Sequence, residues 1–279
     1  MDVNALSPKS ANVRGAPITY YEAGQGEATI LLHGGGPGAS GLSNYRRNVA
    51  ALADAGRRVI VVDMPGFGAS PNRAVETPGL YDHFAQYVLG LMDEIGVERA
   101  SFIGNSLGGG TTLSLALERP ERVDRMVLMG PGGSLALSPF PTEGLIRMLT
   151  FYDGDGPSME KLERVIDMLV FDRSKITPEL MKERYEACTR PDVMANPPLR
   201  GRGANPADDL WRRPLYQLRH PILVIWGRED RVLPVDAAFV LMKALPNAEM
   251  HIFPECGHWA QWEKADRFNG LVATFLNGQ

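Results

Sequence analysis

The segment that most constrains this chain is the pentapeptide Gly104-Asn-Ser-Leu-Gly108, which has the pattern G-x-S-x-G. The apolar run before it, residues 99–103, is typical of a buried strand, and residues 109–117 after it predict a helix. A serine at such a strand–turn–helix junction sits in a strained turn with its hydroxyl exposed above the sheet. Without its neighbours the pentapeptide would be an ordinary glycine-rich turn. In this context it indicates that Ser106 is a nucleophile.

Buried strands and helices alternate along most of the chain. Expected strands lie at residues 18–22, 29–33, 58–63, 99–103, 125–129, 221–227 and 249–253, and expected helices at 44–55, 80–95, 109–117 and 262–276. Apolar strands separated by helices predict a mostly parallel sheet that is covered by helices on both faces. The fold class is therefore α/β, with one early antiparallel strand at residues 18–22.

This alternation stops between residues 138 and 211, where no run resembles a core strand. Amphipathic stretches at residues 159–169 and 178–188, joined by proline-rich segments, predict helices there. We therefore expect a core formed by residues 1–137 and 212–279, with residues 138–211 inserted as a helical lid. The alternative is an ordinary helical extension of the core.

A serine hydroxyl needs a general base, and the base needs a carboxylate that orients it. Asp230 follows the expected strand 221–227, and His258 follows the strand 249–253. Because the carboxyl ends of parallel strands meet at one edge of a sheet, both side chains should reach Ser106. Considered separately, Asp230 would be a turn former or an ion-pair partner, Glu229 is a rival acid, and His258 is one of five histidines.

The loop Gly34-Gly-Gly-Pro-Gly38 leaves the end of the expected strand 29–33 and carries almost no side chains. Its backbone N–H groups can therefore approach a ligand closely. We expect an oxyanion to be bound by the N–H of Leu107, directly after Ser106, and by the N–H of Gly35 in this loop. The alternative is a surface linker, which the position at the end of a buried strand disfavours.

Composition argues against several classes of function. The chain has 279 residues, is 44% hydrophobic and has a net charge of −4, which fits one large domain with an ample core. No basic stripe suggests a nucleic-acid partner, and no apolar stretch approaches the roughly 20 residues of a membrane span. The N-terminus lacks the apolar segment of a signal peptide. Cys188 and Cys256 lie far apart, so we expect free thiols and a cytoplasmic location, and no ligand spacing suggests a metal.

Four motifs together resemble the α/β-hydrolase fold and, more narrowly, its meta-cleavage product hydrolases. They are His33-Gly-Gly-Gly-Pro-Gly38, Gly104-Asn-Ser-Leu-Gly-Gly109, Trp226-Gly-Arg-Glu-Asp-Arg231 and Cys256-Gly-His-Trp-Ala-Gln-Trp-Glu263, of which the last is the most selective. The resemblance spans nearly the whole chain and is weakest at about residues 135–170. Those enzymes hydrolyse a carbon–carbon bond in the vinylogous 1,5-diketones that ring-opening of catechols produces.

The resemblance implies a role for individual residues, without a cofactor and without a metal. It makes Ser106 the nucleophile, His258 the base and Asp230 the partner of that base. It places the following residues around the substrate: Gly35, Gly36, Asn44, Asn105, Ser174, Arg184 and Trp259. A guanidinium binds a carboxylate through two parallel hydrogen bonds, so Arg184 would hold the carboxylate of a dienoate.

Several of these residues also have a purely structural interpretation. Arg184 could be a solvated charge on a helix. Asn44 and Asn105 could cap a helix or form a turn, and Trp259 could belong to the core. Leu42 stands where biphenyl-pathway members of the family would have a larger aromatic side chain, so the sequence leaves the distal substituent of the substrate open.

The implied reaction is cleavage of the C5–C6 bond of a 2-hydroxy-6-oxohexa-2,4-dienoate after conversion of its dienol to the keto form. We expect a small-molecule substrate, no nucleic-acid or membrane partner, and a homo-oligomer that is a dimer or larger. The rival enzyme classes are a serine esterase and a proline iminopeptidase, although the acidic residues that an iminopeptidase needs for its substrate amine are not evident. A non-catalytic, ligand-binding homologue is the alternative outside enzymes.

Overall fold

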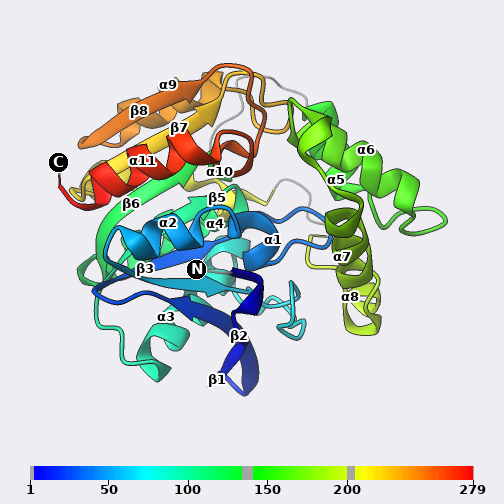
Figure 1. Cartoon of the computed structure of the whole chain (residues 1–279), viewed down its shortest axis with the longest axis horizontal. Coiled ribbons are helices and arrows are strands. Elements are labelled where there is room, and N and C mark those ends of the chain that lie inside the picture. Colours follow the sequence, from blue (N-terminus) through cyan, green and yellow to red (C-terminus); the bar gives the residue numbers. More distant parts are fainter. Residues whose placement is uncertain (1–2, 134–140, 200–204, 279) are drawn as a thin grey trace.

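The computed structural model describes residues 3–133, 141–199 and 205–278. In these ranges one sheet of eight strands has the order β1-β2-β4-β3-β5-β6-β7-β8 (Figure 1). The strands are β1 (Lys9–Val13), β2 (Ala16–Ala23), β3 (Glu27–Leu32), β4 (Arg57–Val62), β5 (Ala100–Asn105), β6 (Val123–Met129), β7 (Ile222–Gly227) and β8 (Ala248–Phe253). β1 and β2 pair antiparallel, β2 joins β4 antiparallel, and every later pair is parallel. The predicted mostly parallel α/β sheet is therefore confirmed.

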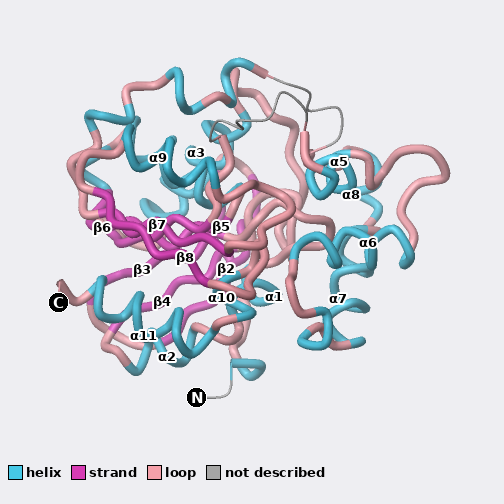
Figure 2. Tube along the Cα trace, turned by 90° about the horizontal axis from the view of Figure 1, so that it is seen from above, coloured by secondary structure: helices cyan, strands magenta, loops and turns pink. Residues whose placement is uncertain are grey.

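Helices cover both faces of this sheet, as Figure 2 shows. One face carries α3 (Leu80–Glu94), α4 (Leu107–Glu118) and α9 (Asp236–Ala244), and the other carries α1 (Gly41–Tyr45), α2 (Val49–Asp54), α10 (Ala260–Glu263) and α11 (Ala265–Leu276). β5 shows why a continuous apolar strand suits this position, because Phe102 packs into the cluster on one face and Ile103 into the cluster on the other. Burying each such side chain contributes about 1.5–3 kcal/mol.

Two predicted helices are interrupted. The helix expected at residues 44–55 is divided into α1 and α2, because a turn intervenes and the side chain of Asn48 donates hydrogen bonds to the carbonyl of Gln261 and to Asn269 Oδ1. The helix expected at residues 262–276 is likewise divided into α10 and α11. β1 and α9 were not predicted. β1 is mostly exposed and lacks the apolar alternation that indicates a strand.

Between β6 and β7 the described residues form helices and no strand. They are α5 (Glu143–Leu149), α6 (Met159–Leu169), α7 (Pro178–Cys188) and α8 (Pro191–Ala195), and these four lie beside the sheet at the right of Figures 1 and 2. α6 and α7 coincide with the two amphipathic stretches of the sequence. Short 3-10 helices occur at Val3–Ala5, Pro120–Arg122, Arg173–Lys175, Pro206–Asp208, Leu210–Arg212 and Leu215–Gln217. Residues 138–140 and 200–204 of the predicted lid lie outside the described residues.

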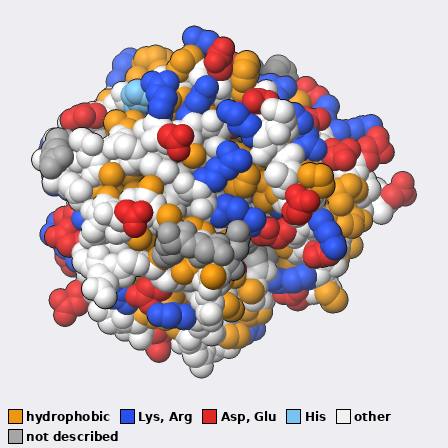
Figure 3. All heavy atoms as spheres, viewed as in Figure 1, with side chains coloured by type: hydrophobic (Ala, Val, Ile, Leu, Met, Phe, Trp, Pro, Cys, Tyr) orange, Lys and Arg blue, Asp and Glu red, His pale blue; other side chains and the backbone are white. Residues whose placement is uncertain are grey.

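The inserted helices have their own apolar cluster, which includes Leu162, Val165, Ile166 and Leu180. Trp259 and Trp262, which come from the segment after β8, belong to the same cluster and join the inserted helices to the core. On the face seen in Figure 3, acidic and basic side chains lie close to one another, in keeping with the small net charge. Both cysteines are free and buried, as predicted. None of the described helices is long and apolar enough to span a bilayer.

Candidate active site

Ser106 lies at the turn between β5, which ends at Asn105, and α4, which begins at Leu107. Its backbone has φ 51° and ψ −110°, a region that a residue with a side chain rarely adopts and that costs about 1–3 kcal/mol. The turn is held by a hydrogen bond from Ser106 N to Met129 O (2.8 Å) and by one from Gly132 N to Ser106 O (2.7 Å).

The two glycines of the pentapeptide are needed because the backbone is crowded. A Cβ on Gly104 would lie 2.5 Å from the carbonyl oxygen of Gly108, and a Cβ on Gly108 would lie 2.1 Å from the carbonyl oxygen of Leu32. Both distances are far below van der Waals contact. The sequence pattern therefore has the backbone geometry of an elbow that presents a serine at the carboxyl end of the sheet.

His258 and Asp230 form a buried pair at the same edge of the sheet. His258 Nδ1 lies 2.6 Å from Asp230 Oδ2, and each side chain is 1% exposed. Asp230 Oδ1 accepts hydrogen bonds from the N–H groups of Val232 (2.8 Å) and Leu233 (2.9 Å). The carboxylate fixes the proton on Nδ1, which leaves Nε2 of His258 free to accept one.

The rival acid Glu229 has different partners. Its Oε2 accepts a hydrogen bond from Cys256 N (3.0 Å), and its Oε1 forms an ion pair with Arg228 (2.7 Å). The structure therefore pairs His258 with Asp230, the residue that the sequence order predicted, and leaves Glu229 to support the loop at Cys256.

Ser106 and His258 line one cavity. Most of the predicted site residues line it too: Gly35, Gly36, Asn44, Asn105, Arg184 and Trp259. Its wall also contains Gly34, Ala39, Met148 and Leu169, which the sequence did not single out. A second cavity shares Gly35, Ala39 and Met148 with the first and has mainly apolar walls.

Arg184 reaches this cavity from α7 and is 0% exposed. Its Nη1 lies 3.4 Å from Ser43 Oγ, and its guanidinium lies 4.9 Å from the centroid of the Trp259 ring. Nε and Nη2 have no hydrogen-bond partner among the described residues. Burial lowers the pKa of Arg184 to about 10, so the side chain is a cation at neutral pH. A buried cation with unpaired N–H groups favours an anionic ligand in this cavity.

Other polar atoms of the cavity also lack partners among the described residues. They are Asn44 Oδ1, Asn105 Oδ1 and His258 Nε2. The amide nitrogen of Asn44 is bound to Ser40 O (3.0 Å), and that of Asn105 is bound to Met129 O (3.3 Å) and His258 O (3.2 Å). The amide groups are thus oriented by the protein, and their oxygens remain available to a ligand that carries donors.

The backbone near Ser106 has the groups expected of an oxyanion site. Leu107 is the first residue of α4, so its N–H has no acceptor within the helix. Gly35 lies against it, because a Cβ on Gly35 would be 3.2 Å from Leu107 Cδ2. The two residues that were predicted to supply the donors are therefore in contact. Their role in binding an oxyanion stays a prediction.

Among the residues that were predicted to surround the substrate, Ser174 is the one that does not line this cavity. It is exposed in the 3-10 helix Arg173–Lys175, and its hydroxyl lies 2.6 Å from Asp172 Oδ1. Its hydroxyl and its N–H thus both donate to Asp172, whose side chain caps this surface turn. Met148 and Leu169, which do line the cavity, belong to amphipathic helices whose apolar positions look alike in the sequence, so no local signal distinguishes them.

Comparison with known proteins agrees with this fold. The alpha/beta hydrolase fold family matches residues 28–265. The chain is 45% identical over 270 residues to the 2-hydroxy-6-oxo-6-phenylhexa-2,4-dienoate hydrolase of Comamonas testosteroni. This alignment covers 93% of the present chain and 91% of the relative. It is 44% identical over 265 residues to the 2-hydroxy-6-oxononadienedioate/2-hydroxy-6-oxononatrienedioate hydrolase of Burkholderia vietnamiensis, covering 93% and 90%.

Solved structures give the same result. The meta-cleavage product hydrolase of Pseudomonas fluorescens has a TM-score of 0.82 and 35% identity, with 98% of each chain covered. The chain therefore belongs to the alpha/beta-hydrolase fold family and, within it, to the meta-cleavage product hydrolases.

Proposed function

We propose that this protein hydrolyses the C5–C6 bond of a 2-hydroxy-6-oxohexa-2,4-dienoate, a product of meta-cleavage of catechols. The observation that carries the proposal is the buried guanidinium of Arg184, whose Nε and Nη2 have no hydrogen-bond partner among the described residues, in the same cavity as Ser106 and His258. A dienoate has a carboxylate at one end and an electrophilic carbonyl at the other. The named activities of the relatives support the same class of substrate.

In the proposed mechanism the substrate carboxylate binds Arg184, and the dienol becomes a ketone. The O2 proton leaves and a proton is added at C5, with Nε2 of His258 as the group that transfers it. Ser106 Oγ then attacks C6 while His258 accepts the hydroxyl proton. The N–H groups of Leu107 and Gly35 bind the resulting oxyanion, each lowering the barrier by about 3 kcal/mol.

Collapse of this intermediate breaks the C5–C6 bond. The bonding electron pair moves through C4 and C3 to the oxygen on C2, which receives the proton that His258 took from Ser106 and gives 2-hydroxypenta-2,4-dienoate. The remaining acyl group stays on Ser106 Oγ. Water, deprotonated by His258, hydrolyses this ester and releases a carboxylic acid and the free serine. No cofactor takes part in this scheme.

Loss of the yellow dienoate colour tests the proposal directly. We expect the wild-type protein to bleach a 6-methyl or a 6-phenyl dienoate, and Ser106→Ala to lower kcat by about 10⁴-fold or more. Ser10→Ala, at an exposed position of β1, should behave as wild type. Bleaching of none of the dienoates would contradict the proposal. Hydrolysis of 4-nitrophenyl esters in that case would indicate an esterase, and dienoate binding without turnover would indicate a binding protein.

We also propose that residues 138–211 act as a lid on the core of residues 1–137 and 212–279, which the position of Arg184 on α7 supports. Two free, buried thiols support a cytoplasmic location, because reducing compartments keep cysteines unpaired. The family resemblance supports a homo-oligomer, a dimer or larger, whose mass light scattering measures.

A further inference from the structure

Glu263, the last residue of α10, is a buried carboxylate that the proposed reaction does not use; it is 5% exposed. Its Oε1 accepts a hydrogen bond from Gly257 N (2.7 Å). Its Oε2 accepts hydrogen bonds from Phe171 N (2.8 Å) and Asp172 N (3.0 Å). Gly257 directly precedes His258, whereas Phe171 and Asp172 follow helix α6. One carboxylate thus connects the loop of the base to the end of an inserted helix.

Further backbone contacts join the same two segments. His258 N donates a hydrogen bond to Leu169 O (2.8 Å). A Cβ on Gly257 would lie 2.8 Å from Leu169 O and 2.9 Å from Phe171 N, so the two backbones touch. The segment of residues 169–172 is therefore the support on which the loop of His258 rests.

The loop that carries Asp230 reaches this support as well. Arg231, the next residue, donates hydrogen bonds from Nη2 to the carbonyl oxygens of Asp167 and Val170, the latter at 2.9 Å. Both members of the acid–base pair are thus held by the end of α6. Leu169 also lines the substrate cavity, so the support lies directly beside the site.

We infer that Glu263 is a positioning residue for His258: its carboxylate fastens the loop of the base to residues 169–172 and so sets the direction of Nε2. This inference rests on the proposed function of His258 as a base. Three N–H groups converge on one carboxylate, and hydrogen bonds to an ionised acceptor are the stronger kind. Burial raises the pKa of Glu263, and the three N–H groups oppose that rise.

Glutamine at position 263 could not replace this arrangement. It has one carbonyl oxygen, and its NH₂ group would face either Gly257 N–H or the N–H groups of Phe171 and Asp172. One of the two segments must then lose its acceptor. A misplacement of a reacting group by about 1 Å can lower the rate of the chemical step by about 10²-fold.

The test compares Glu263→Gln with Glu160→Gln, the same change at a side chain of α6 that is 73% exposed. For Glu263→Gln we expect kcat on the dienoate to fall by about 10- to 100-fold and KM to stay within about threefold, since Arg184 is untouched. Amide hydrogen exchange should become faster at residues 171, 172 and 257. Glu160→Gln should match wild type. An unchanged kcat, or faster exchange spread evenly through β5 and β7, would overturn the inference.

Labelling of Ser106 by a fluorophosphonate separates this inference from the proposed function, because it needs the base but no dienoate. We expect Glu263→Gln to slow labelling by about 10-fold or more. If the wild type is labelled but bleaches no dienoate, the proposed function fails, and the ratio of labelling rates still decides the role of Glu263. Equal rates would refute it.

If Glu263→Gln does not fold, Glu263→Asp replaces it. This variant keeps the charge but shortens the side chain by one methylene, so it can hold only one of the two segments. Slower labelling with faster exchange at that segment supports the inference, and wild-type labelling despite faster exchange refutes it.

Discussion

Arg184 is held in an environment that is unfavourable for a charge. It is fully buried, its one side-chain hydrogen bond within the described part of the chain is the long one to Ser43 Oγ, and its guanidinium lies over the Trp259 ring. Removing a guanidinium from water costs several kcal/mol unless carboxylates and hydrogen bonds compensate for it. The protein therefore sacrifices stability at this position, and a bound carboxylate would restore the missing interactions.

Replacing Arg184 with methionine should separate stability from activity. Arg184→Met keeps a long apolar side chain beside Trp259 and removes the buried charge, so we expect the free energy of unfolding in urea to rise by about 1–4 kcal/mol. The same variant should lower kcat/KM for the dienoate by about 10²-fold or more, because the carboxylate loses its partner. Arg164→Met, on the exposed side of α6, should change neither quantity. If Arg184→Met were less stable than the wild type, the idea that the buried charge of Arg184 destabilises the folded protein would be wrong.

Among the residues of the site, those that follow core strands can be predicted from the sequence, and most of the others cannot. Ser106, Asp230 and His258 each follow an apolar run within a few residues, so their position at one edge follows from the pattern. Ser174 shows the limit, since its place depends on how the inserted helices turn, and no local pattern encodes that. Glu263 belongs to the motif of residues 256–263, yet two of its three backbone partners, Phe171 and Asp172, lie about ninety residues away and become visible only in the folded chain.

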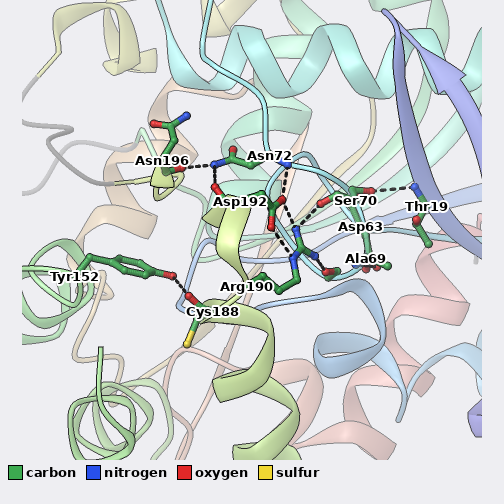
Figure 4. Close-up of polar contacts among 11 residues, drawn as sticks. Thr19, Asp63, Ala69, Ser70, Asn72, Tyr152, Cys188, Arg190, Asp192 and Asn196 are labelled. Atoms are coloured by element: carbon green, nitrogen blue, oxygen red, sulfur yellow. Dashed lines mark hydrogen bonds and ion pairs between the residues drawn. The ribbon is translucent and has the colours of Figure 1, made fainter. Parts of the chain in front are cut away.

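Among the elements, α8 is joined to the loop between β4 and α3 by a compact polar network (Figure 4). Arg190, the residue before α8, donates hydrogen bonds to the carbonyl oxygens of Gly68 and Ser70, the latter at 2.9 Å. It also pairs with Asp192 (2.9 Å), whose carboxylate accepts a hydrogen bond from Asn72 N (3.0 Å). These contacts fix the end of the inserted helices to the core at a second place.

Removal of Arg190 should loosen this attachment. In Arg190→Ala we expect amide exchange to become faster in residues 66–72 and in α8, and the free energy of unfolding to fall by about 1–3 kcal/mol, because two carbonyls lose a charged donor. Exchange in β5 and β7 should keep its wild-type rate. Arg164→Ala removes an exposed arginine that pairs with Glu160 on α6 and serves as the control. Unaltered exchange at residues 66–72 would show that other contacts suffice.

The elements themselves were predictable to different degrees. Strands that are buried on both faces, such as β5, are recognisable in the sequence as apolar runs. The apolar residues of α6 and α7 recur with the period of a helix. The division of α1 from α2 was not predictable, because it depends on hydrogen bonds from Asn48 to residues more than two hundred positions later. Interruptions of this kind come from tertiary contacts and leave the local apolar pattern unchanged.

For the whole molecule, two buried groups give opposite dependences of stability on pH. His33 donates from Nδ1 to Gly34 O (2.8 Å) and accepts at Nε2 from Met64 N (3.1 Å), so its neutral form is satisfied, and burial lowers its pKa to about 4. Burial raises the pKa of Asp63 to about 6. Acidification therefore disfavours the folded state through His33 and favours it through Asp63.

The contribution of His33 can be isolated by substitution. The unfolded chain binds a proton at a pKa near 6.5 and the folded chain only near 4, so this stability is fully present above pH 6.5 and is lost as the pH falls to about 4. Between about pH 6 and 4.5 the free energy of unfolding of the wild type should fall as the pH falls. In His33→Asn we expect this fall to be smaller by up to about 1.4 kcal/mol per pH unit. Urea titrations at several pH values measure this slope. Equal slopes for the two proteins would show that His33 does not contribute to this pH dependence of stability.

Ser106 belongs to the sheet, whereas Arg184 belongs to a helix inserted between β6 and β7. An acid that contacts both residues spans two separately built parts of the chain. The distance between its carboxylate and its reacting carbonyl must match the separation of those parts, so an acid with fewer carbons between the two groups would leave one contact unmade. Selection by molecular length thus follows from where the two side chains are attached.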